Sequence, residues 1–427
     1  MCMNIYIETY GCSSNQCDSE ILSGLLQKAG CDIVKKIDNA DLIIVNTCFV
    51  KQVTEQKIIF RLKDLQMSYP EKKLIISGCM PEGAYRRLVD IAPDASLVST
   101  HQITKIVQAV QKTLEGRRVE YLGKSEEVKL CLPRIRKNSI IGIVPISYGC
   151  NSLCTYCCVR LAKGKLFSFP KEMIVEEIGS ALKEGCKEMW VTAQDTASYG
   201  FDKGEKLPQL LREISKISGK FFVRVGMMNV KNVIPIASDL IEAFNDKKIY
   251  KFVHLPLQSG SDKVLSDMNR GYTASNFEEL ANLFGSLRCQ VWTDIIVGYP
   301  TEEEKDFLKT LEILKKVKPD WVNISKFGPR PGTEAAKLKP LVSKVVNERS
   351  RIASELVRRI SLEKNKEWIG WEGNILVSEK GKKHNQWIGR NLAYKPVLVE
   401  SNSNPFGKFL RVRIIETSHS YLIGKPL

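Results

Sequence analysis

The chain has 427 residues, and its 64 Lys and Arg outnumber its 48 Asp and Glu, which gives a formal net charge of +16. Hydrophobic residues make up 43% and charged residues 26%, an ordinary globular composition that argues against long disordered regions. No run reaches the roughly eighteen apolar residues of a membrane span, and no basic segment precedes an apolar one at the N-terminus, so we expect no membrane association and a cytoplasmic location.

The thirteen cysteines and the positive charge narrow the possible chemistry. In a reducing compartment, an odd number of thiols predicts metal ligands, nucleophiles or small core residues rather than disulfides. The excess of Lys and Arg favours a polyanionic partner, RNA above all, because each phosphate that they neutralise releases counterions. A basic surface that only aids solubility is the other interpretation of the same charge.

The first part of the chain shows a pattern of strands and helices. Short apolar runs rich in Ile and Val at residues 4–9, 41–47 and 73–78 predict strands buried on both faces. Apolar residues at helical spacing follow at residues 19–29 and 54–67. Repeated strand and helix units of this kind predict a parallel sheet.

Cys12, Cys48 and Cys79 each come just after one of these three strands. Right-handed strand and helix units place the carboxyl ends of all strands on one edge of the sheet, so we expect the three thiols to meet on one rim. Each cysteine lies beside flexible or polar residues, as in a loop that wraps a ligand closely. The alternative is that each is a small buried hydrophobic residue.

The middle of the chain predicts a second α/β unit. A polar, charged stretch up to about residue 138 indicates a linker. Six strand-like runs then alternate with helical stretches, which fits a complete or partial parallel barrel with its active site at the carboxyl ends of the strands. These runs are IIGIVPI, EMWVTA, FFVRVG, YKFVHLPL, VWTDIIVGY and WVNISKFG.

The last part of the chain has a different pattern of apolar and polar residues. Residues 342–366 predict one long basic helix. Beyond it, the runs WEGNILVSE, KPVLVES and KFLRVRIIET, separated by turn-rich segments, predict a small antiparallel β-barrel. Basic residues interleaved with aromatic ones on such a barrel suit single-stranded RNA, although about half of the rings are expected to form the core of so small a domain.

Cys150, Cys154 and Cys157 form a C-x3-C-x2-C pattern directly after the first barrel strand. Three thiolates on a short loop leave one iron of a four-iron cluster without a protein ligand, and a small molecule can bind there through its amine and carboxylate. A zinc site with Cys158 as fourth ligand is the alternative, but zinc ligands usually come as two spaced pairs, so Cys158 is expected to be a packing residue. With Tyr156 before the third cysteine, the pattern resembles the hallmark of the radical S-adenosylmethionine superfamily.

Over residues 3 to about 424 the chain resembles the radical methylthiotransferases, which consist of a cluster domain, a radical barrel and a TRAM barrel. The segments that carry the likeness are TYGCSSNQCDSE, NTCFVKQVTEQK, SGCMPE, PRIRKN, YGCNSLCTYCCVR, AQDTASYG, RVGMMN, HLPLQSGSDKVLSDMNRGY, TDIIVGYPTEEEKDF and PRPGTEAAKL. The resemblance implies an α/β protein with a parallel-sheet auxiliary-cluster domain (1–115), a linker (116–138), a partial (β/α) radical barrel with its connecting helix (139–366) and a small antiparallel TRAM barrel that binds RNA (367–427).

Within that family, AQDTASYG, GMMN and HLPLQSGS most resemble the archaeal and eukaryotic branch. The resemblance therefore implies conversion of N6-threonylcarbamoyladenosine, next to the anticodon at position 37 of tRNA, to its 2-methylthio form. The implied partners are the tRNA anticodon stem-loop and an electron-donor protein. A methylthiotransferase acting on isopentenyladenosine in tRNA or on a ribosomal protein is the first alternative, and a non-catalytic iron-sulfur RNA-binding protein is the second.

The resemblance also implies the cofactors and the residues of the site. Two 4Fe-4S clusters are expected, an auxiliary one on Cys12, Cys48 and Cys79 and a radical one on Cys150, Cys154 and Cys157. The residues expected to hold S-adenosylmethionine are Tyr156, Gln194, Asp195, Arg224, Asn229, His254, Gln258 and Asp294. The RNA-contact candidates are Arg390, Tyr394, Lys395, Arg411 and Arg413. No catalytic residue beyond the cluster ligands is assigned.

Several of these residues have a plain structural interpretation as well. Arg224 could pair with a carboxylate, and His254 could be a hydrogen-bonded core histidine. Asn15, Asp18 and other polar residues on the motifs of the first domain are expected to be structural. Lys163 stands where the family commonly has Arg, which weakens any bidentate contact expected there.

Overall fold

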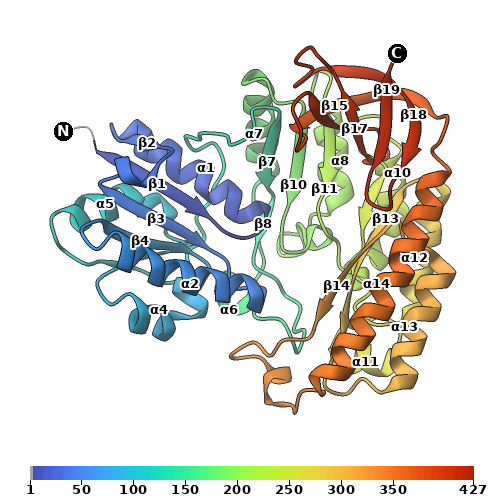
Figure 1. The fold of residues 1–427 in the computed structure, drawn as a ribbon, viewed down its shortest axis with the longest axis horizontal. Coiled ribbons are helices and arrows are strands. Elements are labelled where there is room, and N and C mark those ends of the chain that lie inside the picture. Colours follow the sequence, from blue (N-terminus) through green and yellow to red (C-terminus); the bar gives the residue numbers. More distant parts are fainter. Residues whose placement is uncertain (1–2) are drawn as a thin grey trace.

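The computed structural model describes residues 3–427, which form three parts in chain order (Figure 1). The first part is a six-stranded parallel sheet in the order β2-β1-β3-β4-β5-β6. Its strands are β1 (Asn4–Thr9), β2 (Asp32–Val34), β3 (Leu42–Thr47), β4 (Lys73–Gly78), β5 (Ser96–Ser99) and β6 (Glu120–Tyr121). The three predicted strands are confirmed, and β6 lies inside the segment predicted as a linker.

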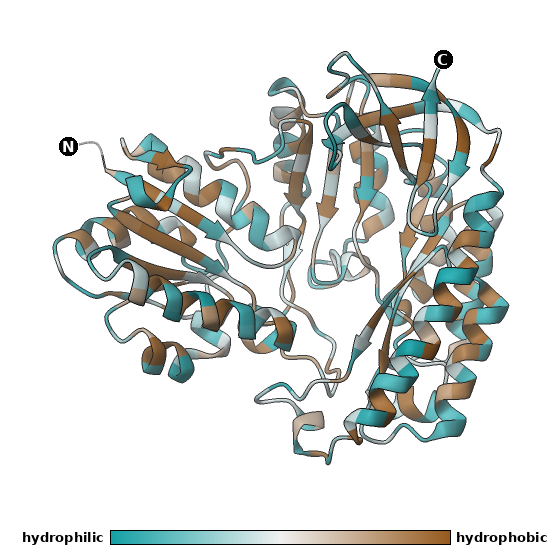
Figure 2. Cartoon of the chain, viewed as in Figure 1, coloured by the Kyte–Doolittle hydropathy of each residue, from teal (hydrophilic) through white to brown (hydrophobic). Residues whose placement is uncertain are grey.

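Helices cover both faces of this sheet, which explains why its central strands read as unbroken apolar runs. One face packs against α1 (Ser13–Lys28) and α5 (Ile106–Leu114), and the other against α2 (Gln52–Ser68) and α4 (Tyr85–Ile91). Shorter turns are η1 (Ile37–Asn39), α3 (Met80–Gly83) and η2 (Ile103–Lys105). Figure 2 shows the hydrophobic colour concentrated on the strands between these helices.

The second part contains all six predicted barrel strands. They form two parallel sheets, β11-β10-β7 and β12-β13-β14, so the barrel is open rather than closed. The strands are β7 (Ile141–Pro145), β10 (Glu188–Thr192), β11 (Phe222–Val225), β12 (Phe252–His254), β13 (Gln290–Val297) and β14 (Trp321–Lys326). The longer outer helices are α7 (Lys171–Lys183), α8 (Leu207–Lys216), α10 (Ala237–Phe244), α12 (Ala274–Ser286) and α13 (Glu304–Val317).

Short elements decorate the barrel and lie close to the loops described below. They are β8 (Ser147–Tyr148), α6 (Val159–Lys163), β9 (Phe167–Ser168), η3 (Thr196–Ser198), α9 (Val230–Val233), η4 (Ile234–Ile236), α11 (Asp262–Asp267) and η5 (Glu334–Lys337). The basic helix is present as α14 (Ser343–Lys366), and it buries Leu356, Val357 and Ile360 in the barrel core. Among the helices of residues 3–427, none is long and apolar enough to span a lipid bilayer.

The third part is a closed five-stranded barrel in the order β15-β16-β17-β19-β18. Its strands are β15 (Glu372–Lys380), β16 (Gln386–Arg390), β17 (Pro396–Glu400), β18 (Phe409–Thr417) and β19 (Leu422–Pro426). Neighbouring strands pair antiparallel except β17 and β19, which are parallel. The barrel packs against the amino ends of the central strands, where Phe409 meets Phe222 and Tyr394 meets Phe252.

The first part is joined to the central barrel through α1. Ile141 and Ile143 of β7 lie in the same apolar core as Ile21 and Leu22 of α1. This packing turns the carboxyl ends of the first sheet towards the loops that follow β7 and β10. The site described next lies at this junction, at the end of the barrel opposite the small C-terminal barrel.

Candidate active site between two cysteine triads

Cys12, Cys48 and Cys79 meet on one rim of the first sheet, as the strand pattern predicts. They follow β1, β3 and β4, which are neighbours in the sheet. Asn15 joins two of them, because its side-chain oxygen accepts from Cys12 Sγ at 3.4 Å and its Nδ2 lies 3.9 Å from Cys79 Sγ. Gly11 has a φ of +124°, and a Cβ there would lie 2.7 Å from the Cβ of Cys48, so only glycine lets the first loop approach the second.

Burial disfavours charge on two of these thiols, Cys48 and Cys79, in the absence of a metal. Burial first, and then the neighbouring Cys79 and Cys12, raise the pKa of Cys48 to about 11. Burial also raises the pKa of Cys79. Three thiols on adjacent loops are a donor set for a metal cluster, which would deprotonate them on binding.

The second set, Cys150, Cys154 and Cys157, lies on the loop between β8 and α6. The loop is fixed at its far side, because Thr155 donates its backbone N–H to Met268 O at 3.1 Å and its hydroxyl to Asp267 O at 2.9 Å. Burial raises the pKa of Cys157 to about 12. Cys158 belongs elsewhere, since its thiol donates to the carbonyl of Phe49 at 3.2 Å and packs in the core of the first part.

One cavity of about 350 Å³ lies between the two sets. Five of the six predicted ligands line it, namely Cys12, Cys79, Cys150, Cys154 and Cys157. Cys48 lies behind them, buried on the loop that follows β3. Two thiol sets from distant parts of the chain therefore face a shared space, and the cavity is large enough for small organic groups between them.

The donor set and the cavity fit two iron-sulfur clusters. Within residues 3–427, no three His, Cys, Asp or Glu side chains converge closely enough to hold a single metal ion. A cubane cluster instead takes each thiolate on a different iron. Gln194 lines the cavity, and its buried side-chain oxygen has no hydrogen-bond partner among residues 3–427, which leaves an acceptor for the amine of a bound ligand.

Six of the eight residues predicted to hold the cofactor line this cavity: Tyr156, Gln194, Asp195, Asn229, Gln258 and Asp294. Asp195 is buried and accepts from the backbone N–H of Asn229 at 2.9 Å and from Asn232 Nδ2 at 2.6 Å. Burial opposes ionisation of Asp294, but the hydrogen bond from His254 Nε2 at 2.8 Å holds the pKa of that carboxyl below its usual value. His254 does not line the cavity, so its contact with the site is through Asp294.

Arg270 is a site residue that our sequence prediction missed. Its guanidinium donates to Cys154 Sγ at 3.1 Å, to the Tyr156 hydroxyl at 3.3 Å and to Asn229 Oδ1 at 3.1 Å. It thus places a fixed positive charge beside the second cysteine set, where anionic thiolates would otherwise repel one another. The only signal in the sequence is its place in DMNRGY, one of the segments that carry the family likeness.

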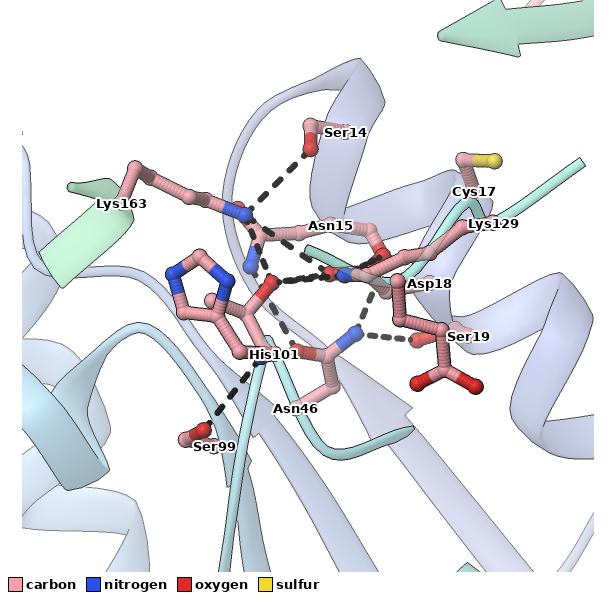
Figure 3. Close-up of polar contacts among 12 residues, drawn as sticks. Ser14, Asn15, Cys17, Asp18, Ser19, Asn46, Ser99, His101, Lys129 and Lys163 are labelled. Carbon is pink, nitrogen blue, oxygen red and sulfur yellow. Dashed lines mark hydrogen bonds and ion pairs between the residues drawn. The ribbon is translucent and has the colours of Figure 1, made fainter. Parts of the chain in front are cut away.

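Asp18, Lys129 and Lys163 form a buried charge network (Figure 3), and Asp18 and Lys163 lie close enough to Cys79 to influence its pKa. Asp18 of α1 accepts from Lys129 Nζ at 3.0 Å and from the Thr100 hydroxyl at 2.8 Å, and Lys163 of α6 lies 3.8 Å from its second oxygen. Lys163 also donates to Thr100 at 2.7 Å and lies 3.4 Å from Ser14 Oγ. Burial opposes its charge, but Cys79, Asp18, Cys12 and Cys48 together raise the pKa of Lys163, so the ammonium faces the thiols of the first set.

Three predicted site residues lie at the interface with the small barrel rather than in the cavity. Arg224, predicted to hold the cofactor, lies outside the cavity and stacks on the rings of Trp190, Phe252 and Tyr394, because its strand directs it towards the small barrel. Tyr394 and Lys395, predicted to contact RNA, are buried in the same interface, and Lys395 pairs with Asp320 at 3.0 Å.

The three predicted arginines of the small barrel differ from one another. Arg390 is largely covered, pairs with Glu379 at 2.9 Å and stacks on Tyr394. Arg411 and Arg413 point to solvent with side-chain exposures of 67% and 57%, both beside Glu372. Only these two of the five RNA-contact candidates have accessible cationic groups.

Three family models match the chain. They are described as uncharacterized protein family UPF0004 over residues 4–100, radical SAM superfamily over residues 144–329, and TRAM domain over residues 368–427. The first matches the sheet that carries Cys12, Cys48 and Cys79, and the second matches the open barrel. The third matches the closed five-stranded barrel.

Three relatives match this chain over nearly its whole length. A Methanothermobacter thermautotrophicus protein named probable threonylcarbamoyladenosine tRNA methylthiotransferase is 44% identical over 424 residues and covers 99% of both chains. A Pyrococcus abyssi protein of the same name is 41% identical over 439 residues and covers 100% of both chains. The human threonylcarbamoyladenosine tRNA methylthiotransferase is 32% identical, and the match covers 99% of this chain and 74% of the human one.

Solved structures with the same fold are more distant. The radical S-adenosylmethionine methyltransferase TsrM of Kitasatospora setae, with cobalamin and a 4Fe-4S cluster bound, matches with a TM-score of 0.60 at 12% identity, covering 79% of this chain and 74% of TsrM. OxsB, a cobalamin-dependent S-adenosylmethionine radical enzyme, matches with a TM-score of 0.53 at 12% identity, covering 83% of this chain and 56% of OxsB. At such low identity the likeness shows the fold alone.

Proposed function

The chain belongs to the family of threonylcarbamoyladenosine tRNA methylthiotransferases, and we propose that it places a methylthio group on C2 of N6-threonylcarbamoyladenosine next to the anticodon of tRNA. The observation that carries this proposal is the shared cavity, because a transfer between two centres requires both to face the same substrate. Five thiols from the two triads line that cavity.

In this proposal each triad holds one 4Fe-4S cluster, Cys12, Cys48 and Cys79 the auxiliary one and Cys150, Cys154 and Cys157 the radical one. When bound, the two clusters and S-adenosylmethionine supply a carbon-centred radical and the methylthio group. The protein contributes positioning and exclusion of water. Phe49, Val159, Met227 and Pro256 give the cavity apolar wall, which keeps water from a reactive intermediate.

Polar residues at the strand ends would orient the cofactor and the base. Gln194 offers its unpartnered side-chain oxygen to an amine. Asp195 and Asn229 form one buried pair at the end of β10 and β11. In the other sheet, His254 and Asn323 hydrogen-bond to the carboxylate of Asp294 and favour its ionised form. These groups surround the space on two sides, so a base entering the cavity meets fixed partners rather than mobile ones.

The RNA would approach from the open end of the cavity, and the target adenine would leave the anticodon-loop stack to enter it. Unstacking a base costs a few kcal/mol, most of which an already single-stranded loop avoids. Arg411 and Arg413 of the TRAM barrel are the proposed phosphate contacts, which would position the RNA rather than select its sequence. We also propose that a protein electron donor reduces the radical centre and that the enzyme works in the cytoplasm.

Mass spectrometry of tRNA nucleosides from cells lacking this protein tests the proposal. We expect the 2-methylthio-N6-threonylcarbamoyladenosine peak to disappear and the unthiolated nucleoside to accumulate. A plasmid carrying the chain should restore the peak, the Cys150→Ala variant should not, and Cys158→Ala should, since that thiol packs against Phe49. An unchanged peak in the deletion strain would refute the substrate, and loss of a methylthio group from isopentenyladenosine or a ribosomal protein would assign the other branch.

A further inference from the structure

Among the residues that the structure describes, one cationic side chain of the cavity has no partner in the protein. Five charged side chains line it: Arg160, Lys163, Asp195, Arg270 and Asp294. Four of them have hydrogen bonds or ion pairs described above. Within residues 3–427, the side chain of Arg160 has no hydrogen bond and no ion pair, and it lies on no aromatic ring.

The backbone around Arg160 is fixed although its side chain is free. Arg160 lies in the short helix α6, three residues after Cys157 and three residues before Lys163. Its carbonyl accepts from the backbone N–H of Gly164 at 2.9 Å, and Ala162 and Lys163 on the same helix are buried against the first part of the chain. Arg160 is thus a partly buried residue that lines the cavity from a rigid backbone, which reduces the entropy lost when its side chain binds a ligand.

An unpaired guanidinium in an otherwise paired cavity is suited to an anion. Arg presents a planar fork of donors that matches a carboxylate in bidentate geometry. The substrate proposed above carries one such group, because its N6 substituent ends in the carboxylate of threonine. On the adenine ring, N1 lies between C2 and C6, and C6 carries N6, so a base that turns C2 towards the cysteines keeps its N6 side chain within the same end of the cavity.

We propose that Arg160 is the specificity-determining residue that binds the threonyl carboxylate of the substrate. This inference rests on the proposed function and deepens it. It separates the two kinds of tRNA substrate considered above, since isopentenyladenosine has an uncharged N6 substituent that would leave the guanidinium of Arg160 without a partner. Binding of an uncharged substituent would then desolvate the cation without compensation.

A pair of matched RNAs tests this role directly. Both are anticodon stem-loops, one with N6-threonylcarbamoyladenosine and the other with its carboxamide, which has nearly the same shape and no charge. Affinities are measured by fluorescence anisotropy on anaerobic holoenzyme with S-adenosylmethionine. We expect the wild type to prefer the carboxylate by about tenfold to a hundredfold, the range of a charge-assisted hydrogen bond.

Three variants of Arg160 give graded expectations. Arg160→Met should bind both RNAs with the affinity that the wild type has for the carboxamide. Arg160→Lys should keep part of the preference, because an ammonium holds a carboxylate as a point charge, and Arg160→Glu should reverse it. Iron content equal to that of the wild type shows that each variant retains its clusters and its fold.

Arg413→Ala is the matched control, since a phosphate contact should lower the affinity for both RNAs by the same factor. The proposal is overturned if Arg160→Met keeps the preference for the carboxylate, or if it weakens both RNAs, or S-adenosylmethionine, alike. It is also overturned if the wild type shows no preference. Failure of the proposed function looks different, because then the wild type methylthiolates neither RNA and the nucleoside profile of the deletion strain is unchanged.

Discussion

Lys163 Nζ lies 3.8 Å from Asp18 Oδ2, an ion pair that joins helix α6 of the central barrel to helix α1 of the first sheet. Lys129, from the segment between these two parts, pairs with the other oxygen of the same carboxylate at 3.0 Å. All three side chains are almost fully buried. A single aspartate therefore neutralises two cations at the place where the two cysteine sets face each other.

Replacing Asp18 by Asn should destabilise the protein strongly. The variant keeps the shape of the side chain but leaves two buried ammonium groups facing a neutral amide, which costs about 3–5 kcal/mol in comparable buried pairs. Urea unfolding should show the loss as a lower midpoint. Asp90→Asn, at an exposed position on α4, is the control and should change nothing, and an equal midpoint for Asp18→Asn would show that the network does not hold the parts together.

Replacing Arg270 should impair the radical step. Arg270→Met removes the donor to Cys154, Tyr156 and Asn229 at once, and each charge-assisted bond contributes about 1.5–3 kcal/mol. We expect 5′-deoxyadenosine formation under a strong reductant to fall by about tenfold or more, with Arg270→Lys intermediate because an ammonium cannot reach three partners in one plane. Normal formation in Arg270→Met with full iron content would contradict a role for this residue at the site.

The fold was largely predictable because its strands are buried on both faces. Each of β1, β3 and β4 contains a short apolar run, and β3 is buried throughout, so parallel topology places Cys12, Cys48 and Cys79 together without any knowledge of side-chain packing. The strands that were missed, such as β16 and β19, are short and alternate with polar residues, so their burial is decided by closure of the small barrel rather than by local composition.

Side-chain environments were less predictable than strands. Tyr394 and Lys395 have the composition of an RNA-binding surface, but only the docking of the small barrel decides that they lie inside. Arg270 is distant in sequence from Cys154, and their contact depends on Met268 O holding the loop of Thr155. Sequence patterns report local periodicity, whereas these contacts arise from the packing of segments more than a hundred residues apart.

Substitution of Tyr394 should affect mainly stability, and substitution of Arg413 mainly RNA binding. The buried ring of Tyr394 packs against Tyr250 and Phe252 with centroids 4.9 and 5.0 Å away, so Tyr394→Ala should cost about 3–5 kcal/mol on urea unfolding. Its effect on tRNA affinity, measured where the variant is folded, should be small. Arg413→Ala should do the reverse, leaving stability within about 1 kcal/mol and weakening tRNA binding with a smaller salt dependence.

His101 should make stability depend on pH. Burial first, and then Lys129 and Lys163, lower its pKa from 6.5 to about 4. Between these two pH values the unfolded chain binds a proton at His101 and the folded chain does not. The free energy of unfolding is therefore unaffected by His101 above pH 6.5 and decreases as the pH falls towards 4, by at most about 1.4 kcal/mol per pH unit. Urea midpoints of His101→Gln should fall less on acidification than those of the wild type, whereas His384→Gln, at an exposed position, should match the wild type.

Iron analysis of single cysteine variants should divide the six thiols into two independent sets. Fully reconstituted wild type should contain about eight irons per chain, four for each cubane cluster. Cys79→Ala should retain about half of this iron and still produce 5′-deoxyadenosine, because the loop of Cys150, Cys154 and Cys157 is held by Met268 and Asp267 rather than by the first sheet. It should form no methylthio product.

Cys154→Ala should also lose half of the iron, together with 5′-deoxyadenosine formation, and Cys158→Ala should lose neither. A Cys79→Ala protein with all of its iron, or with no radical cleavage, would mean that the two sets do not act as separate centres facing one cavity.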